Sequence, residues 1–168
     1  MMTTGNRKIN GIPWLFLQLM VVEDATRVKT LMTDMICNHL GVKPIYSVAD
    51  AKDFISRKGF AAKKRIAICH SRYGLMGGIG YSIEQSPNLH AVVSFWLGDG
   101  FQGKGYGSKA LLLLCNRLQR LVLTHFMAQA YAYNIASQRA LCKAGFKPIA
   151  ENNTHEANDV VDFERRVG

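Results

Sequence analysis

Apolar residues recur along the chain at two kinds of spacing, and the alternation between them predicts the order of the secondary structure. Short apolar runs bounded by turn residues predict strands, and spacings of three and four residues predict helices. The predicted strands cover residues 14–20, 65–70, 75–84, 91–97, 125–131, 146–149 and 160–165. The predicted helices cover residues 23–40, 47–58, 134–144 and a stretch that begins near Ser108.

This order of elements, β α α β β β α β α β β, predicts an α/β or α+β domain with a central mixed sheet. Short turns join the three predicted strands between residues 65 and 97, so we expect an antiparallel meander there. We expect the last two strands to form a closing hairpin. Gly77, Gly78 and Gly80 fall inside one predicted strand, which indicates a bulge or a close approach of another backbone. We expect residues 1–12 to be flexible.

The composition is typical of a soluble globular protein, since 48% of the 168 residues are hydrophobic and 20% are charged. The net charge of +9 favours anionic partners such as nucleic acid or phosphorylated cofactors. The polar N-terminal stretch lacks the apolar run of a signal peptide, and the apolar segment 14–22 is too short to span a membrane. We therefore expect a cytoplasmic protein.

The four cysteines are widely spaced and lie in apolar or helical contexts: Cys37, Cys69, Cys115 and Cys142. They form no CxxC pair and no cluster with other metal ligands. We therefore expect free thiols that pack inside the protein, rather than a zinc site or catalytic nucleophiles.

The stretch from Trp96 to Leu123 places a glycine cluster between a predicted strand and a predicted helix. The glycines of this cluster are Gly98, Gly100, Gly103, Gly105 and Gly107. Glycine lets the backbone approach a ligand closely, and the first turn of a helix offers unpaired N–H groups at the positive end of its dipole. The pattern therefore predicts a loop that binds phosphate.

Two nucleotide-binding motifs fit this loop only in part. Residues 98–103 match GxGxxG, but a dinucleotide site also needs an acidic residue about 20 positions later, and no Asp or Glu occurs between Gly100 and Ala150. Residues 98–104 begin like the phosphate loop of an NTPase, but Gly105 stands where a Ser or Thr should hold Mg²⁺. The residues therefore argue against both kinds of nucleotide site.

The third match is Gln102-Gly-Lys-Gly105-Tyr-Gly107, which resembles motif A of the GNAT (Gcn5-related N-acetyltransferase) superfamily. Downstream, the segment Asn134-Ile-Ala-Ser137 begins a predicted helix that ends at Gly145-Phe146, and this is similar to a second signature of the superfamily. The strands 75–84 and 91–97 also resemble the ribosomal-protein N-acetyltransferase (RimJ/RimL-like) branch. The similarity is good from about residue 75 to residue 148 and only architectural before that.

The resemblance implies a GNAT fold, in which a mixed, mostly antiparallel twisted sheet of six or seven strands is flanked by about four helices. Residues 13–168 would form this single acetyltransferase domain. The resemblance also implies acetyl-CoA as the cosubstrate, without a metal, and strands 91–97 and 125–131 that splay apart around the pantetheine arm. The cofactor-binding residues expected on this basis are Phe95, Trp96, Leu97, Gln102, Gly103, Lys104, Gly105, Tyr106, Gly107, Ser108, Asn134 and Ser137.

The chemistry of acetyl-CoA agrees with these residues. Backbone N–H groups of residues 102–108 can hold the pyrophosphate without a metal. A backbone N–H near Phe95 or Leu97 would polarise the thioester carbonyl. The basic residues that could meet the 3′-phosphate are Lys104 and Lys109, and behind them Arg117, Arg120, Arg139, Lys143 and Lys147.

Transfer by direct attack of an amine on the thioester needs a group that protonates the leaving thiolate. Ser137 is the first candidate for this role, with Tyr131 and Tyr133 as alternatives. Asn134 is the expected partner of a pantetheine amide, and it can also cap the helix that follows it.

The general base has no single candidate. Related enzymes often carry a Glu in the strand before the loop, and here Val92 and Val93 stand at that place. The nearby substitutes are Glu84, His90 and Asp99, with Glu84 first. Deprotonation through water, or an amine that is already neutral, needs no dedicated base. An α-amine has an ordinary pKa of about 7.7–8.0, against about 10.4 for lysine.

The leading hypothesis is an acetyl-CoA-dependent N-acetyltransferase that acts on a protein N-terminus or a small amine. The basic surface argues mildly against polycationic acceptors and is compatible with a ribosomal or RNA-associated protein target. Two alternatives stay open: a non-catalytic GNAT-fold module that binds CoA or RNA, and a toxin-like acetyltransferase of aminoacyl-tRNA. We expect no membrane partner, and either a monomer or a homodimer.

Overall fold

The computed structural model of the protein describes residues 15–56, 64–149 and 159–168. Its strands are β1 (Leu15–Leu19), β2 (Lys64–His70), β3 (Gly74–Glu84), β4 (His90–Leu97), β5 (His125–Tyr131), β6 (Lys147–Pro148) and β7 (Val160–Arg166). Its helices are η1 (Val22–Asp24), α1 (Ala25–Leu31), α2 (Asp34–Leu40), α3 (Val48–Ser56), η2 (Asp99–Phe101), α4 (Tyr106–Gln119) and α5 (Ile135–Lys143). Trp14 and residues 57–58, which we placed in a strand and a helix, lie outside the described residues.

The strands form one seven-stranded sheet in the order β1-β2-β3-β4-β5-β7-β6. Every neighbouring pair is antiparallel except β4 and β5, which run parallel. β2, β3 and β4 form the expected meander, and β6 pairs with β7 as the expected hairpin. β7 also pairs with β5 along its whole length, so it lies between β5 and β6. The prediction of a mixed, mostly antiparallel sheet is confirmed.

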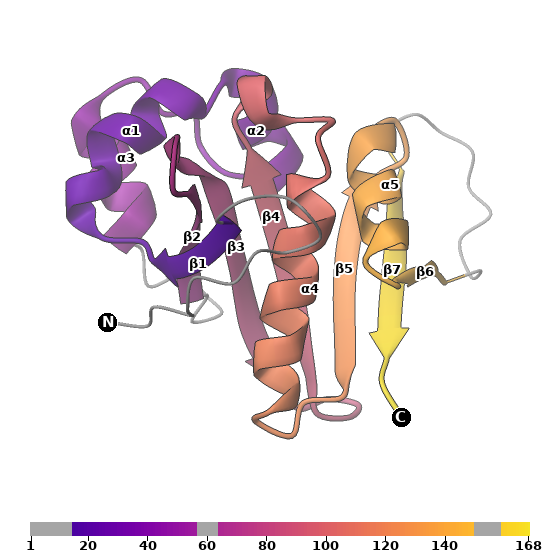
Figure 1. Ribbon diagram of the computed structural model, residues 1–168. Helices are drawn as coiled ribbons and strands as arrows, with labels where there is room; N and C mark the ends of the chain where they lie inside the picture. Colours follow the sequence, from indigo (N-terminus) through magenta and orange to yellow (C-terminus); the bar gives the residue numbers. More distant parts are fainter. Residues whose placement is uncertain (1–14, 57–63, 150–158) are drawn as a thin grey trace.

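Helices cover both faces of the sheet and give the molecule two apolar cores (Figure 1). α4 and α5 pack on one face, and α1, α2 and α3 pack on the other. β2 serves both cores, because Ile68 belongs to the first while Ala67 and Cys69 belong to the second, as the alternation of a strand requires. Among the described residues, no helix is long and apolar enough to cross a membrane.

The segment that we predicted as one helix over residues 23–40 is divided. α1 ends at Leu31 and α2 begins at Asp34. Met32 between them is extended, with φ of −83° and ψ of 97°. The Thr33 hydroxyl accepts a hydrogen bond from the Ile36 N–H at 3.3 Å, which makes Thr33 the N-cap of a new helix. The prediction of one continuous helix is therefore wrong, and the division adds one α-helix to the expected set.

The sheet opens in its middle, between β4 and β5. Only two residue pairs, Ala91 with Phe126 and Val92 with Met127, join these strands. Beyond them, β4 stays paired with β3 as far as Leu97, and β5 stays paired with β7 as far as Tyr131. The two strands therefore diverge toward the end of the sheet where the glycine loop follows β4, as the resemblance implied.

Glycines let β3 lie close against β4 beside this opening. Gly77 is paired with Leu97, and Gly78 with Trp96. A Cβ added to Gly77 would overlap the carbonyl oxygen of Trp96 and lie 2.9 Å from the Cα of Leu97. A Cβ added to Gly78 would overlap the indole of Trp96. The close backbone approach that the glycine run predicts is confirmed.

Candidate active site

A cavity of about 440 Å³ occupies the opening between β4 and β5. Its volume lies in the range of small-molecule and cofactor sites. Its walls come from five parts of the chain: α2, β4, the glycine loop with the start of α4, β5, and α5. The lining residues are Met35, Ile36, His39 and Leu40 of α2, residues 92–97 of β4, Asp99, Gln102, Gly103, Gly105, Gly107 and Ser108, residues 128–131 of β5, and Asn134, Ala136, Ser137, Arg139, Ala140, Leu141 and Lys143.

Hydrogen bonds from three side chains hold the glycine loop in shape. The Gln102 Nε2 donates to the carbonyl of Leu97 at 2.9 Å, which ties the loop back to the end of β4. The Lys104 Nζ donates to the carbonyl of Gly100 at 3.0 Å. The Ser108 Oγ donates to the carbonyl of Gly105 at 3.1 Å. Gln102 and Lys104 thus stabilise the conformation of the loop.

The loop needs glycine for two different physical reasons, a left-handed backbone and a close contact. Gly103 and Gly105 have φ of 73° and 83°, in the left-handed region that favours glycine. Gly105 is the N-cap of α4, which is why that helix begins at Tyr106 and not near Ser108. Gly107 packs on β4, because an added Cβ would lie 3.0 Å from the ring of Phe95. The first N–H groups of the 14-residue helix α4 therefore face a cavity large enough for an anionic ligand.

Asn134 joins the start of α5 to α2. Its Oδ1 accepts a hydrogen bond from the Ser137 N–H at 3.2 Å, so it caps the helix as the sequence suggested. Its Nδ2 lies 3.3 Å from the Nδ1 of His39. Gln138 secures the same turn, since its Nε2 donates to the carbonyls of Tyr131 and Ala132 at 3.2 and 2.8 Å. The end of β5, the first turn of α5 and the last turn of α2 are thus connected around the cavity.

A parallel sheet junction that opens beside a glycine loop and a capped helix is the arrangement that the resemblance implied. The sequence model of the acetyltransferase (GNAT) domain matches residues 15–147. The chain belongs to the GNAT acetyltransferase family. It is an N-acetyltransferase. No curated protein matches the chain.

Solved GNAT structures share the fold over most of this chain. The aminoglycoside acetyltransferase AAC(6')-Ib in complex with coenzyme A has a TM-score of 0.72 at 19% identity, over 89% of this chain and 93% of that chain. Spermidine N-acetyltransferase from Vibrio cholerae, in complex with CoA and spermine, has a TM-score of 0.73 at 15% identity. The match covers 90% of this chain and 95% of that chain. A Vibrio cholerae protein provisionally assigned as a ribosomal-protein-serine acetyltransferase has a TM-score of 0.68 at 20% identity. The match covers 92% of this chain and 94% of that chain.

Around the cavity of this GNAT enzyme, the structure brings together all of the predicted cofactor residues except Lys104 and Tyr106. Tyr106 lies instead near the ring of His70, at 6.0 Å between centroids. Lys109 does not line the cavity either, whereas Arg139 and Lys143 do, one helical turn apart on α5. Arg139 and Lys143 thereby replace Lys104 and Lys109 as the first candidates for a phosphate contact.

The predicted acids lie close to the cavity. Ser137 and Tyr131 both line it, and both are half-buried. Tyr133 is exposed and stacks on Tyr131, with ring centroids 5.2 Å apart and an angle of 14° between the planes. Ser137 lies in the first turn of α5, and its N–H is already bonded to Asn134.

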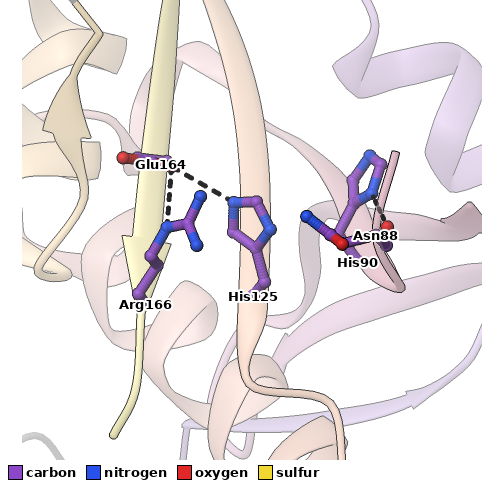
Figure 2. A network of polar contacts seen from close by, with 5 residues as sticks. All are labelled: Asn88, His90, His125, Glu164 and Arg166. Carbon is purple, nitrogen blue, oxygen red and sulfur yellow. Dashed lines mark hydrogen bonds and ion pairs between the residues drawn. The ribbon is translucent and has the colours of Figure 1, made fainter. Parts of the chain in front are cut away.

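Two of the predicted bases lie at the other end of β4. Glu84 and His90 are paired across β3 and β4, and their side chains approach to 3.7 Å. Figure 2 shows this region, where the His90 Nδ1–H donates to the Asn88 carbonyl at 2.7 Å. Neither Glu84 nor His90 lines the cavity, while Val92 and Val93 do. Glu84 is consequently absent from the catalytic set that we propose below.

Figure 2 also shows His125 and Arg166 converging on Glu164, both at 3.2 Å. Burial alone would raise the pKa of Glu164, but the hydrogen bonds and charges of Arg166 and His125 outweigh it and hold that pKa below its usual value. This cluster joins β5 to β7 and none of its residues lines the cavity, so we assign it to the stability of the sheet.

Asp99 is the predicted base that does line the cavity. It lies in η2 at the start of the glycine loop, and its Oδ1 accepts a long hydrogen bond of 3.4 Å from Gln102. Among the described residues it is the one carboxylate in the cavity wall. Within the described parts of the chain, no three His, Cys, Asp or Glu side chains are grouped as metal ligands.

His39 is the residue of this GNAT site that the sequence did not reveal. It is half-buried in the last turn of α2, where its ring lies 5.3 Å from the ring of Tyr133. Its position depends on how α2 packs over β4 and α5, which are far away in the sequence. A histidine in a helical pattern carries no local signal for such a contact.

Proposed function

We propose that this enzyme acetylates the α-amine of a protein N-terminus, in the manner of the RimJ/RimL-like branch, by direct attack on the thioester in a ternary complex. The observation that carries the proposal is the wall that α2 gives to the cavity. Met35, Ile36 and Leu40 supply apolar surface there, and His39 is the polar group. An amine attached to a neutral peptide fits such a wall.

Charge also disfavours acceptors with many amines. A polyamine or an aminoglycoside is held best by several carboxylates, and Asp99 stands alone among the described lining residues. The net charge of +9 would also repel a polycation. An α-amine, whose ordinary pKa is about 7.7–8.0, is partly neutral near pH 7.5 and depends less on a base than a lysine does.

In this proposal, acetyl-CoA lies along the opening between β4 and β5. The N–H groups of residues 102–108 and the first turn of α4 hold the pyrophosphate. The pantetheine arm lies between β4 and β5, with one of its amides on Asn134. Arg139 and Lys143 reach toward the 3′-phosphate. The support for this placement is that the cavity connects these groups without a break.

The catalytic roles follow from this placement. A backbone N–H of β4, at Phe95 or Leu97, polarises the thioester carbonyl as negative charge develops on its oxygen. Ser137 donates a proton or a hydrogen bond to the leaving sulfur, and Tyr131 is the alternative donor. These catalytic roles are supported by the position of the residues, because all four line the cavity: Phe95, Leu97, Tyr131 and Ser137.

The proposal includes a ribosomal or RNA-associated protein as the target and a cytoplasmic location, with residues 13–168 acting as one domain in a monomer or homodimer. The net charge of +9 supports such a target, because rRNA can supply the opposite charge. The Vibrio cholerae protein assigned to ribosomal-protein acetylation is a fold relative that fits this view. The aminoglycoside and spermidine enzymes share the same fold, so the fold by itself does not select the acceptor.

The test combines calorimetric titration with acetyl-CoA and a thiol-release assay on a panel of acceptors. The panel holds short peptides with free N-termini, the same peptides blocked at the N-terminus but carrying lysine, spermidine, and an aminoglycoside. We expect binding of acetyl-CoA and thiol release only with free N-termini. Preference for spermidine or the aminoglycoside would overturn the proposal, and binding without turnover on any amine would favour a non-catalytic module.

A further inference from the structure

We propose that His39 accepts the proton that the acceptor amine loses, a role that rests on the acetyl transfer proposed above. His39 lies on the wall of the cavity that the glycine loop and α5 leave to the acceptor. His70, His90 and His125 do not line the cavity, so His39 is the one imidazole in its wall among the described residues. Imidazole is the side chain best suited to exchange protons near neutral pH.

The hydrogen bonds around Asn134 decide which nitrogen of His39 carries a lone pair. The Ser137 N–H donates to the Asn134 Oδ1, so the amide is oriented with its Nδ2 toward His39. An amide nitrogen only donates, and therefore the Nδ1 of His39 must accept. The neutral ring then carries its proton on Nε2 and presents a lone pair at Nδ1.

The contact that occupies this lone pair is long and can be exchanged. The distance of 3.3 Å from Asn134 Nδ2 to His39 Nδ1 exceeds the usual range for such a bond. Asn134 is also the group that we assign to an amide of pantetheine. When pantetheine takes the Asn134 Nδ2–H, the Nδ1 of His39 becomes available to the amine. Binding of acetyl-CoA would thus prepare the base.

The surroundings of His39 can support a positive charge on its ring. It lies in the last turn of α2, near the carbonyl end of the helix, which favours a cation. The ring of Tyr133 lies 5.3 Å away at an angle of 47°, within the distance over which an aromatic ring attracts a cation. The titratable groups that share the cavity or contact His39 are Tyr131, Tyr133, Asp99, Arg139 and Lys143, and α2 itself carries Asp34 in its first turn.

Other groups in the cavity are poorer proton acceptors. Asp99 lies at the start of the glycine loop and its Oδ1 already accepts from Gln102. Tyr131 and Ser137 carry neutral hydroxyl groups that donate more readily than they accept a proton at neutral pH. Among the described lining residues, His39 is the one that brings an imidazole nitrogen to the α2 wall.

The proton balance of the step is complete. The substrate ammonium gives one proton to the His39 Nδ1, and the neutral amine attacks the carbonyl carbon as the C–N bond forms. The C–S bond then breaks, and the second proton lost by the amine nitrogen ends on the CoA sulfur, by way of Ser137 or Tyr131. His39 returns its proton to solvent, so the products are the N-acetyl amine, CoA thiol and one released proton.

The experiment compares wild-type enzyme with His39→Gln and His39→Ala in pH profiles of kcat and kcat/KM for an N-terminal peptide. Below the pKa of the amine, we expect His39→Gln to lower kcat/KM by about 10²- to 10⁴-fold, the usual contribution of a general base. The deficit should shrink as the pH rises past about 8, where the amine is already neutral. The Kd for acetyl-CoA should stay close to that of the wild type, and added imidazole should restore activity to His39→Ala.

His125→Gln is the matched control, since it removes an imidazole that lies outside the cavity. It should leave the pH profile of turnover unchanged. A His39→Gln profile that runs parallel to the wild type at every pH would overturn the role of His39 while leaving the acetyltransferase intact. A wild-type enzyme that acetylates no peptide would instead overturn the proposed function, and the role of His39 with it.

Nitrogen NMR of the His39 ring supplies a second readout that does not depend on turnover. The free protein should show the tautomer with its proton on Nε2, and addition of CoA should shift the Nδ1 resonance as Asn134 turns to pantetheine. The opposite tautomer, or no response to saturating CoA, would contradict the exchange that we propose.

Discussion

A single residue at the cavity can both stabilise the fold and contact a ligand, and Asn134 is placed to do both. Its Oδ1 caps α5 through the Ser137 N–H, while its Nδ2 faces His39 and the cavity. Serine replaces asparagine well as an N-cap but cannot reach as far. The two duties can therefore be separated by choice of the substituting residue.

Asn134→Ala should lower the free energy of unfolding by about 1 kcal/mol, the usual value of an N-cap, and should weaken acetyl-CoA binding. Asn134→Ser should keep nearly all of the stability but show the same loss of affinity. Chemical denaturation and calorimetric titration of both variants provide the measurement. If Asn134→Ser binds acetyl-CoA as tightly as the wild type, Asn134 caps α5 but does not contact acetyl-CoA.

A substitution at Gly105 tests whether the glycine loop binds the pyrophosphate. Gly105→Glu places a negative charge beside the proposed pyrophosphate and strains a backbone with φ of 83°, so acetyl-CoA binding should be lost. Gly74→Glu is the matched control, because Gly74 has φ of 70°, has no atom near an added Cβ, and does not line the cavity. It should show comparable strain in thermal unfolding but normal binding by calorimetry. Normal binding by Gly105→Glu would show that the pyrophosphate lies elsewhere.

The cysteines differ in what burial does to their thiols. Burial raises the pKa of Cys69 to about 12, and burial also raises the pKa of Cys37 and of Cys115. Cys142 is exposed, so the prediction that all four thiols pack inside the protein is wrong for this one. Because the thiolate is the reactive form, an aromatic disulfide reagent at pH 8 should modify Cys142 quickly and the other three only after denaturation. Rapid modification of more than one thiol in the native enzyme would contradict this burial.

At the scale of elements, the tight contact between β3 and β4 fixes the wall that carries Phe95, Trp96 and Leu97. Gly77→Ala should destabilise the protein by about 1–3 kcal/mol, because the new methyl group would overlap the carbonyl oxygen of Trp96. Gly100→Ala is the comparison, since no atom lies near an added Cβ there and its φ is not positive. Urea unfolding should show the loss in the first variant and nearly normal stability in the second.

The elements also show which parts of the site the sequence can predict. The loop from Gln102 to Ser108 and the cap at Asn134 are local patterns, in which glycine spacing and a polar residue before a helix carry the signal. The break at Thr33 is local too, but the apolar periodicity on either side of it concealed a good N-cap. The α2 wall with His39, and the choice of Arg139 and Lys143 over Lys104, depend on packing between distant elements. No spacing in one stretch of chain predicts such packing.

At the scale of the whole molecule, the sheet carries a separate core on each face. α4 and α5 build one core, on the side of the loop proposed for the cofactor, and α1 to α3 build the other, on the side of the wall proposed for the acceptor. Trp96 belongs to the second core and also lines the cavity, so it couples the acceptor side to β4. The cosubstrate and the acceptor would therefore enter from different layers and meet between β4 and β5.

The junction between β4 and β5 rests on only two residue pairs, so the molecule is close to two half-sheets joined at one end. Under the proposed placement of pantetheine, the cosubstrate fills the gap and acts as a temporary strand. CoA must leave after each transfer, so the sheet would be completed and interrupted once in every catalytic cycle. Release of CoA from this gap would then limit turnover whenever the chemical step is faster.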